Sequence, residues 1–472
     1  MNDLNFILPE IFISLSIMFL LVLGVFKKKS SRLIFNISLL VLLITAIITL
    51  NETYSINRIT LFNNSVVIDH MASLMKIITL ICAFLVLTIS SNYLKIFKIL
   101  KIEYPILILS SVLGMMVMIS SNDLLVFYMG LELQSLALYV LATFNRDQLK
   151  STEAGLKYFV LSALSSGLLL YGCSLIYGFS GSTNFEIIAN QLTSDEYVLT
   201  FGIVFILVGL AFKISAVPFH MWAPDVYEGS PTSVTLFFTM VPKIAALTVF
   251  IRFLYVPFLN LIDQWQMIIV FLSIASMLFG AIAAIGQTNI KRLIAYSSIG
   301  HVGYILAGLA TGSNEGIQSS IIYITIYVIM NLALFSCLLM LKRNDQYYED
   351  IDDLSGLSKN HPLLSLSLLV ILFSLAGIPP LAGFFAKFYI FKTVIEQSMY
   401  FLAIVGLLST VVAAFYYLRI IKIIYFDNEK DKYDEDHSLW LKFSLTFSTI
   451  LILLYFIFPS QLIDVISRIS II

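Results

Sequence analysis

The sequence has 472 residues, of which 59% are hydrophobic and 12% are charged, and its formal net charge is −1. A soluble globular protein carries about a quarter charged residues, so this composition excludes that class. Apolar runs of about 20 residues, each long enough to cross the hydrocarbon core of a bilayer as a helix, recur along nearly the whole length. The sequence therefore predicts an all-α polytopic membrane protein.

The apolar runs, taken in chain order, predict about fourteen transmembrane helices. The run from Phe6 to Phe26 is too long for the core of a cleaved signal and has no basic region before it, so we expect it to be the first span. The expected spans are 4–26, 33–50, 68–91, 105–121, 123–143, 155–178, 199–221, 232–254, 262–285, 291–310, 316–341, 363–392, 398–424 and 438–458. Residues 459–472 form a short apolar tail.

Most basic loop residues fall on one side of the predicted bilayer. They follow the first, third, fifth, eleventh and thirteenth spans and precede the tenth, whereas Arg58 and Arg252 are exceptions on the opposite side. By the positive-inside rule, the basic loops face inward and both termini face outward. The regular alternation also supports the predicted number of spans.

Two expected spans contain prolines within an apolar run. Pro218 interrupts the seventh span, and Pro379 and Pro380 interrupt the twelfth. Proline removes a helix hydrogen bond, and in lipid the freed carbonyl survives only inside protein or beside a wet cavity. A simple kink would explain each interruption, but Lys213 or Lys387 lies within two turns of each one, which favours a functional break.

The breaks recur at the same place in two consecutive blocks of five spans. Repeats with an odd number of spans must be inverted relative to each other, and inverted repeats with broken helices are typical of transporters. We therefore predict two inverted five-helix repeats, each containing a broken helix. The expected organisation is an N-terminal three-helix segment (1–103), a first antiporter-like repeat (104–255), a second repeat (256–426) and a C-terminal helix with its tail (427–472).

Four charged side chains lie near the middle of apolar runs, namely Glu132, Lys213, Lys243 and Lys387. A charge at that depth costs several kcal/mol or more, and such residues usually mark ion or proton paths. Burial disfavours a charged ammonium group, whereas a nearby carboxylate favours it. Moving Glu132 toward or away from Lys213 would therefore make the lysine hold or release a proton, and the pattern predicts a proton path.

His301, in AYSSIGHVGYILAG, suits a relay between Lys243 and Lys387, because imidazole donates and accepts protons near neutral pH. A hydrogen-bonded packing histidine is the alternative. Lys387 would be the terminal base before the outward exit, unless it snorkels past the helix break. Further hydroxyl groups on the same span are those of Tyr296, Ser297, Ser298 and Tyr304.

Glu153 and His220 are weaker candidates for proton transfer. Glu153 lies four residues before Lys157 at the inward end of the sixth span, a spacing that permits a surface ion pair. The pair explains Lys157, and Glu153 is an auxiliary candidate for proton transfer. His220 follows the break in the seventh span and would either line an inward half-channel or pack. Asp225 and Glu228 in the next loop would attract protons, although a solvated turn explains them equally well.

No motif indicates a cofactor in this chain. Cys82, Cys173 and Cys337 lie in apolar runs without CxxC spacing, so metal or iron–sulfur ligation is not expected. The sequence contains no GxGxxG or P-loop fingerprint in a βαβ setting. We therefore expect no bound cofactor, no metal and no nucleic-acid partner.

Three long stretches of the sequence resemble the N-subunit family of NADH:quinone oxidoreductase, respiratory complex I, whose organellar equivalent is mitochondrial subunit 2. They read LVGLAFKISAVPFHMWAPDVYEGSPTSVTLFFTMVPKIAAL, KRLIAYSSIGHVGYILAG and SLAGIPPLAGFFAKF, and the likeness covers essentially the whole chain. The family has a glutamate on span five, lysines on spans seven, eight and twelve, and a relay position on span ten. These positions match Glu132, Lys213, Lys243, Lys387 and His301.

The resemblance implies a proton-translocating membrane-arm subunit that is driven by quinone reduction elsewhere in the complex. NADH, FMN, iron–sulfur clusters and quinone would then bind to other subunits. The implied partners are the adjacent antiporter-like M subunit, small K-, J- and A-type subunits and the lipid bilayer. Lys387 favours N over M, which usually has a glutamate there. The expected location is the inner (plasma) membrane of a bacterium rather than an organellar inner membrane.

Three other functions stay open at this point. A subunit of a multisubunit cation/proton antiporter would share the inverted repeats and the buried lysines. A stand-alone secondary transporter of an organic solute would have a solute cavity and would act when expressed alone. A passive scaffold would leave the four buried charges unexplained.

Overall fold

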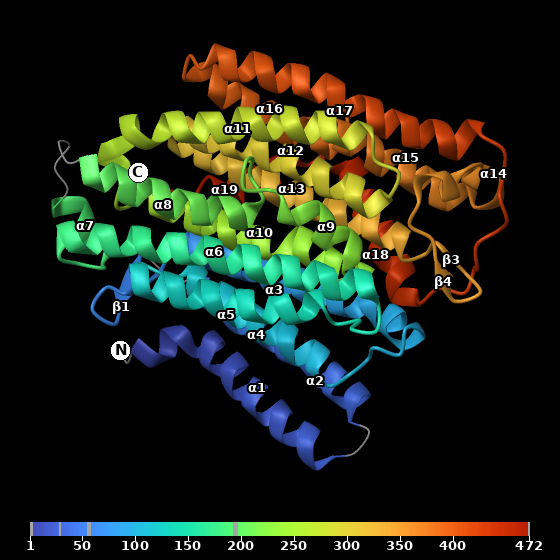
Figure 1. Ribbon diagram of the computed structural model, residues 1–472, viewed down its shortest axis with the longest axis horizontal. Coiled ribbons are helices and arrows are strands. Elements are labelled where there is room, and N and C mark those ends of the chain that lie inside the picture. The colour runs from blue at the N-terminus through green and yellow to red at the C-terminus, as the bar shows by residue number, and fades with distance from the viewer. Residues whose placement is uncertain (1–2, 28–29, 54–57, 192–196, 471–472) are drawn as a thin grey trace. The chain divides into compact units, whose positions relative to one another are not determined.

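The computed structural model describes residues 3–27, 30–53, 58–191 and 197–470. These residues fold almost entirely into helices (Figure 1). The first ten helices are α1 (Leu8–Phe26), α2 (Ser31–Thr53), α3 (His70–Ile96), α4 (Glu103–Ile119), α5 (Leu124–Ala142), α6 (Leu149–Ser180), α7 (Phe185–Gln191), α8 (Tyr197–Ile214), α9 (Trp222–Gly229) and α10 (Thr232–Tyr255). The others are α11 (Ile262–Ile285), α12 (Ile290–Ala310), α13 (Asn314–Leu338), α14 (Leu357–Asn360), α15 (Pro362–Ala376), α16 (Ala382–Glu396), α17 (Tyr400–Phe426), α18 (Leu439–Leu454) and α19 (Pro459–Ile466).

The remaining regular structure lies in short connecting elements. Two antiparallel hairpins are present, one of β1 (Ile59–Leu61) with β2 (Val66–Ile68), and one of β3 (Lys342–Arg343) with β4 (Gln346–Tyr347). Ile59 lies opposite Ile68 in the first, and Lys342 lies opposite Tyr347 in the second. Short 3-10 helices are η1 (Asp3–Ile7), η2 (Leu259–Leu261) and η3 (Ile351–Leu354).

The helix lengths confirm a multi-pass α-helical membrane protein. Among the described residues, ten helical segments are long and apolar enough to cross a bilayer, or eleven if α18 and α19, which are bent by 89°, form one span. The helices α4, α8 and α15 are apolar but shorter. The predicted count of fourteen is therefore not confirmed. The predicted apolar tail includes the helix α19, which Pro459 opens at a position that proline tolerates.

The chain forms two compact units, and each is described by itself. The first unit contains the described residues up to Ile214 and the segment Gly229–Trp265. Its centre is α10, which is buried along its whole length and packs against α3, α4, α5 and α8. The helices α4 and α5 approach closely, because a Cβ atom on Gly114 would lie 2.5 Å from the backbone nitrogen of Gln134. This contact fixes the rotation of α5, which carries two residues of the candidate site.

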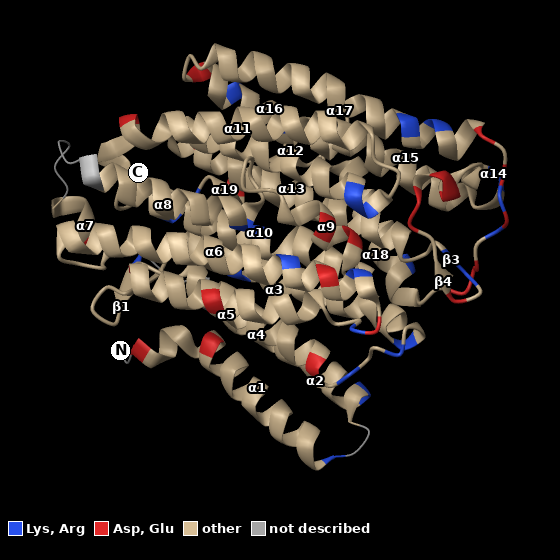
Figure 2. Ribbon diagram, in the orientation of Figure 1, with Lys and Arg blue, Asp and Glu red and all other residues tan. Residues whose placement is uncertain are grey.

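The second unit contains Ser215–Glu228 and Gln266–Ser470. Its centre is α13, which packs against α12, α15, α16 and α18, and the long helix α17 packs against α12, α15 and α16. Figure 2 shows that charges are sparse along these helices and gather in the loops near the β3–β4 hairpin. The predicted segment boundaries, the inverted relation of the repeats and the orientation of the termini stay predictions.

Candidate functional site

The predicted break beside Lys213 is present. The helix α8 ends at Ile214, Ser215 has a left-handed φ of 64°, and the Val217–Pro218 peptide bond is cis. Helix α9 begins only at Trp222. Lys213 therefore lies in the last turn of α8, where the exposed carbonyl groups of a helix end favour a positive charge.

Hydroxyl groups from two other helices surround the Lys213 ammonium group. Its Nζ atom donates to Ser135 Oγ on α5 at 2.6 Å and to Ser162 Oγ on α6 at 2.8 Å. The Tyr139 hydroxyl donates to the same Ser162 oxygen at 2.5 Å, and the Tyr139 ring lies 5.9 Å from Nζ. Because hydroxyl groups both donate and accept hydrogen bonds, this shell can pass a proton to or from the lysine.

Glu132 lies one turn before Ser135 on α5, so both side chains lie on the same face of that helix. Its Oε1 atom is buried and makes no hydrogen bond within the described part of the chain. The hydrogen bonds of Lys213 go to the two serines, and no ion pair between Glu132 and Lys213 occurs among the described residues. Exchange of a proton between Glu132 and Lys213 therefore stays a prediction that requires movement.

Lys243 occupies the most enclosed position of the predicted lysines. It follows Pro242 inside α10, a helix in which every residue is buried, and the lysine itself is 3% exposed. Its side chain cannot snorkel to a membrane surface from a helix of that kind. The expectation that this ammonium group is sequestered from bulk solvent is therefore confirmed.

The predicted break beside Lys387 is also present, in the second unit. The helix α15 ends at Ala376, Gly377 has a φ of +88°, the Pro379–Pro380 peptide bond is cis, and α16 begins at Ala382. A φ of this kind suits glycine, which has no Cβ atom. The residues between α15 and α16 end the hydrogen-bond ladder of α15, and its last carbonyl groups therefore have no helical partners.

Lys387 uses the carbonyl groups that this break leaves open. Its Nζ atom donates to the carbonyl oxygen of Leu375 at 3.2 Å and to that of Ala376 at 2.9 Å. The ring of Tyr304 lies 5.1 Å from the same nitrogen. The residue is 5% exposed. The alternative that Lys387 snorkels out of the break is wrong, because its ammonium group points back to the end of α15.

His301 makes hydrogen bonds with both of its ring nitrogens. Nδ1 lies 2.7 Å from the hydroxyl of Tyr323 on α13, and Nε2 lies 3.3 Å from the hydroxyl of Tyr417 on α17. The Tyr417 hydroxyl lies 2.5 Å from Ser297 Oγ. The histidine is 3% exposed, so it is buried and hydrogen-bonded, as a packing histidine would be. The same hydroxyl groups are also the partners that a proton relay requires.

A small cavity joins His301 to Lys387. It has a volume of about 10 Å³, and both residues line it together with Ser297, Tyr304 and Tyr417. A space of that size holds about one water molecule, provided that polar groups face it. The predicted relay residue and the predicted terminal base therefore share one polar space in the second unit.

The two auxiliary candidates lie in less enclosed surroundings. Glu153 and Lys157 form the expected ion pair at 2.7 Å on α6, with side chains 54% and 42% exposed. His220 is half-buried, and its ring lies 4.5 Å from the ring of Phe279. A role of Glu153 or His220 in proton transfer stays a prediction.

The acidic residues after the first break were expected in a loop, but they lie in the short helix α9. Asp225 and Glu228 both accept from Arg292 at 2.7 and 3.1 Å, so their carboxylates form an ion-pair cluster at the start of α12. The interpretation as a purely solvated turn is therefore wrong, because all three side chains are half-buried and paired.

Ion pairs explain the two basic residues that break the loop-charge pattern. Arg252 is 2% exposed and donates to both oxygens of Asp69, at 2.9 and 3.1 Å. Arg58 pairs with Glu186. Sequence reasoning had marked both arginines as exceptions but had no means of finding acids that lie more than a hundred residues away.

Sequence reasoning missed one further buried pair. Lys76 on α3 lies 2.5 Å from Glu10 on α1, and both side chains are almost fully buried. Glu10 and Lys76 each lie near the start of an apolar run, so neither stood out as a charge near mid-span. Their contact is a product of how α1 packs within the first unit.

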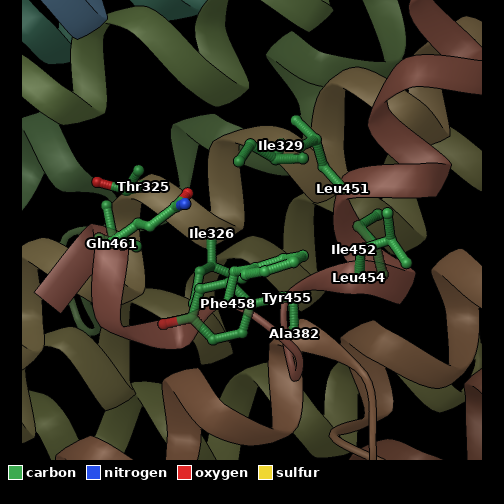
Figure 3. A pocket seen from close by; sticks show the side chains of 11 residues that line it. Thr325, Ile326, Ile329, Ala382, Leu451, Ile452, Leu454, Tyr455, Phe458 and Gln461 are labelled. Carbon is green, nitrogen blue, oxygen red and sulfur yellow. The ribbon is translucent and has the colours of Figure 1, made fainter.

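A larger cavity contains none of the predicted proton-transfer residues. It has a volume of about 270 Å³ and is lined mainly by apolar side chains of α13, α18 and α19 (Figure 3). Polar atoms reach it from Thr325 and Gln461. No group of three or more His, Cys, Asp or Glu side chains that would hold a metal occurs in the described ranges.

Comparisons with known proteins identify the family. Residues 121–413 match the family model "NADH:quinone oxidoreductase/Mrp antiporter, TM". A relative from Pelagibacter ubique, named NADH-quinone oxidoreductase subunit N, is 77% identical over the full length of both chains. A relative of the same name from Paramagnetospirillum magneticum is 49% identical and covers 98% of this chain and 96% of its own.

Solved structures agree with this assignment. A chain in respiratory complex I from Thermus thermophilus with bound aureothin is 28% identical, with a TM-score of 0.84 over 98% of this chain and all of its own. A chain of the Mrp complex from Dietzia has a TM-score of 0.87 over 99% of this chain and 97% of its own, but it is 21% identical and shows the fold alone. The chain therefore belongs to the NADH-quinone oxidoreductase subunit N family, within the wider NADH:quinone oxidoreductase/Mrp antiporter family.

Proposed function

We propose that this chain moves protons across the membrane as a membrane-arm subunit of a NADH:quinone oxidoreductase, driven by quinone reduction elsewhere in the complex. The observation that carries the proposal is the burial of three lysines, Lys213, Lys243 and Lys387, at 8%, 3% and 5% exposure. A buried lysine changes its protonation state readily when its surroundings change, which an arginine does not. The relatives named subunit N support the complex to which the chain would belong.

The proposed path uses each site according to its partners. In the first unit, Lys213 exchanges protons through the hydroxyl groups around it, Glu132 shifts its proton affinity, and Lys243 stores the proton at the most enclosed point. In the second unit, His301 receives the proton and Lys387 is the last base before the exit. Moving one proton against a potential of 100 mV requires about 2.3 kcal/mol.

The proposed partners are a neighbouring antiporter-like M subunit, small K-, J- and A-type subunits and the surrounding lipid. NADH, FMN, iron–sulfur clusters and quinone would bind to other subunits. The location would be the inner (plasma) membrane of a bacterium, since the relatives named above are bacterial proteins.

The test measures proton uptake by inverted membrane vesicles during NADH oxidation. Lys243→Met and Lys387→Met remove the charge but keep an unbranched apolar side chain, and Lys157→Met in the exposed pair is the matched control. We expect each buried variant to lower the rate of proton uptake by about tenfold or more, as loss of a proton-transfer group does, while Lys157→Met has no effect. Normal proton uptake per NADH oxidised in both buried variants would refute the proposal.

A cation/proton antiporter subunit is the second candidate, and the fold of the Mrp complex chain favours it. The same vesicles distinguish the two functions. A sodium gradient in the absence of NADH would drive proton movement through an antiporter, whereas a subunit of the oxidoreductase moves protons only while NADH is oxidised.

A further inference from the structure

The hydroxyl group of Tyr417 connects His301 to a second hydroxyl, that of Ser297 on α12. It lies 3.3 Å from His301 Nε2 and 2.5 Å from Ser297 Oγ. Tyr417 is 2% exposed and Ser297 is 6% exposed, so the contacts are shielded from bulk solvent. Tyr417 comes from α17, more than a hundred residues away in sequence, and was not among the predicted site residues.

The two neighbours of His301 on α12 lie in opposite directions along the helix. Ser297 is one turn closer to Ile290, the end of α12 next to the basic residues that predict the inward side. Tyr304 is about one turn closer to the other end, and its hydroxyl lies 3.0 Å from Ser409 Oγ and 2.9 Å from Thr410 Oγ1. Hydroxyl groups therefore continue from the histidine region in both directions.

The tautomer of the imidazole sets the direction of the hydrogen bonds. A neutral imidazole has one donor nitrogen and one acceptor nitrogen. When Nδ1 donates to Tyr323, Nε2 accepts from the Tyr417 hydroxyl, and Tyr417 in turn accepts from Ser297. A proton that reaches the Ser297 oxygen then moves by exchange. Ser297 passes its own proton to Tyr417, Tyr417 passes its own to Nε2, and the histidine becomes a cation while both hydroxyls are restored.

We propose that Tyr417 and Ser297 form the inward branch by which protons reach His301, while Lys387 and Tyr304 form the outward branch. This inference rests on the proposed function and adds a supply of protons from the inward side directly to the second unit. The two branches meet at the cavity of about 10 Å³ that Ser297, Tyr417, His301, Tyr304 and Lys387 line, and a water molecule there would accept the proton of the histidine cation and pass it to Lys387. Tyr417 is a proton-carrying residue in this scheme, not an anchor for the imidazole ring.

The experiment uses vesicles with the full complex and four variants. Tyr417→Phe keeps the ring and removes the hydroxyl, Ser297→Ala removes the other hydroxyl, and Ser297→Thr retains it. Tyr425→Phe removes a hydroxyl two turns further along the same helix and is the control. We expect Tyr417→Phe and Ser297→Ala each to lower NADH-driven proton uptake by about tenfold, and the double variant to lower it no further. Ser297→Thr and Tyr425→Phe keep normal uptake.

A solvent isotope measurement separates proton transfer from a structural role. Loss of one hydroxyl makes transfer into His301 rate-limiting, so the ratio of uptake rates in H₂O and D₂O rises in Tyr417→Phe. A loss of uptake with an unchanged ratio, or normal uptake in Ser297→Ala, overturns the inference. Normal uptake in Tyr417→Phe overturns it as well, but leaves the proposed function intact if Lys387→Met still abolishes uptake. The amount of assembled complex, measured by immunoblot, corrects each rate for folding.

Discussion

The replacement Asp69→Asn removes one charge from the buried pair with Arg252 and leaves the rest of the side chain in place. Asp69 also caps α3, since its Oδ1 accepts from the backbone N–H of Ala72 at 2.7 Å. Asparagine is about as good a cap as aspartate, so the helix start is retained. The change therefore isolates the effect of leaving the Arg252 guanidinium group buried without a counter-charge.

The structure sets the size of the effect. Removing one partner of a buried ion pair costs about 3–5 kcal/mol, because the other charge stays uncompensated. Arg252→Met is milder, since the Asp69 side chain is 19% exposed and keeps its hydrogen bond with Ala72. We expect about 2 kcal/mol there, the contribution of a charge-assisted hydrogen bond. The double variant should lose less than the sum of the two single variants, because they share one interaction.

The assay is thermal unfolding of the detergent-purified complex, followed through this chain. The expected order of Tm is wild type, then Arg252→Met, then Asp69→Asn. Burial alone would raise the pKa of Asp69, but the Arg252 guanidinium group and the Ala72 N–H hold this pKa below its usual range. The pair therefore contributes fully above the ordinary carboxyl pKa of about 3.9 and is lost as the pH falls through the lowered value. An Asp69→Asn variant as stable as wild type at pH 7 would refute this reasoning.

Three further predictions concern the proton path. Gly377→Ala places a Cβ atom 3.0 Å from Lys387 Cδ and 3.2 Å from its Nζ, at a φ of +88°. We therefore expect lower proton uptake per NADH and a loss of stability of about 1–2 kcal/mol from the backbone conformation. Unchanged uptake would contradict this, because it would show that the lysine side chain moves away without loss of function. Ser135→Ala removes an acceptor that stabilises the Lys213 ammonium group, so the pH optimum of proton uptake should move to lower pH, and an unmoved optimum would contradict this. Glu153→Gln breaks an exposed ion pair, so we expect the free energy of unfolding to change by no more than about 0.5 kcal/mol and the rate of proton uptake to stay the same. A clear loss of uptake would support the auxiliary role of Glu153.

The sequence predicted the helix breaks because their cause is local. A proline within an apolar run removes a hydrogen bond wherever the helix packs, so the ends of α8 and α15 lie where Pro218 and the pair of prolines after Gly377 require them. The depth of the lysines was predictable for a similar reason, since the length of an apolar run sets the distance of its middle from solvent. The number of spans was less predictable, because α4, α8 and α15 are apolar but shorter than the other helices that could cross a bilayer.

The partners of these lysines were not predictable. Ser135, Ser162 and Tyr417 are ordinary residues in apolar helices, and nothing in their local sequence separates them from other buried hydroxyls. Their roles depend on the rotation and depth of each helix relative to its neighbours, which packing decides. The close approach of α4 and α5 at Gly114 is one such contact, and it fixes the face of α5 that carries Glu132 and Ser135.

The two broken helices hold their lysines with different chemistry, and the difference decides what each site can do. Lys213 donates to hydroxyl oxygens, which can donate in turn, so a proton can arrive or leave through its own partners. Lys387 donates to the carbonyl oxygens of Leu375 and Ala376, which only accept. Those carbonyls stabilise the charged lysine but cannot carry its proton onward. We therefore expect a proton on Lys387 to be exchanged through the small cavity that this lysine shares with His301 and Tyr304.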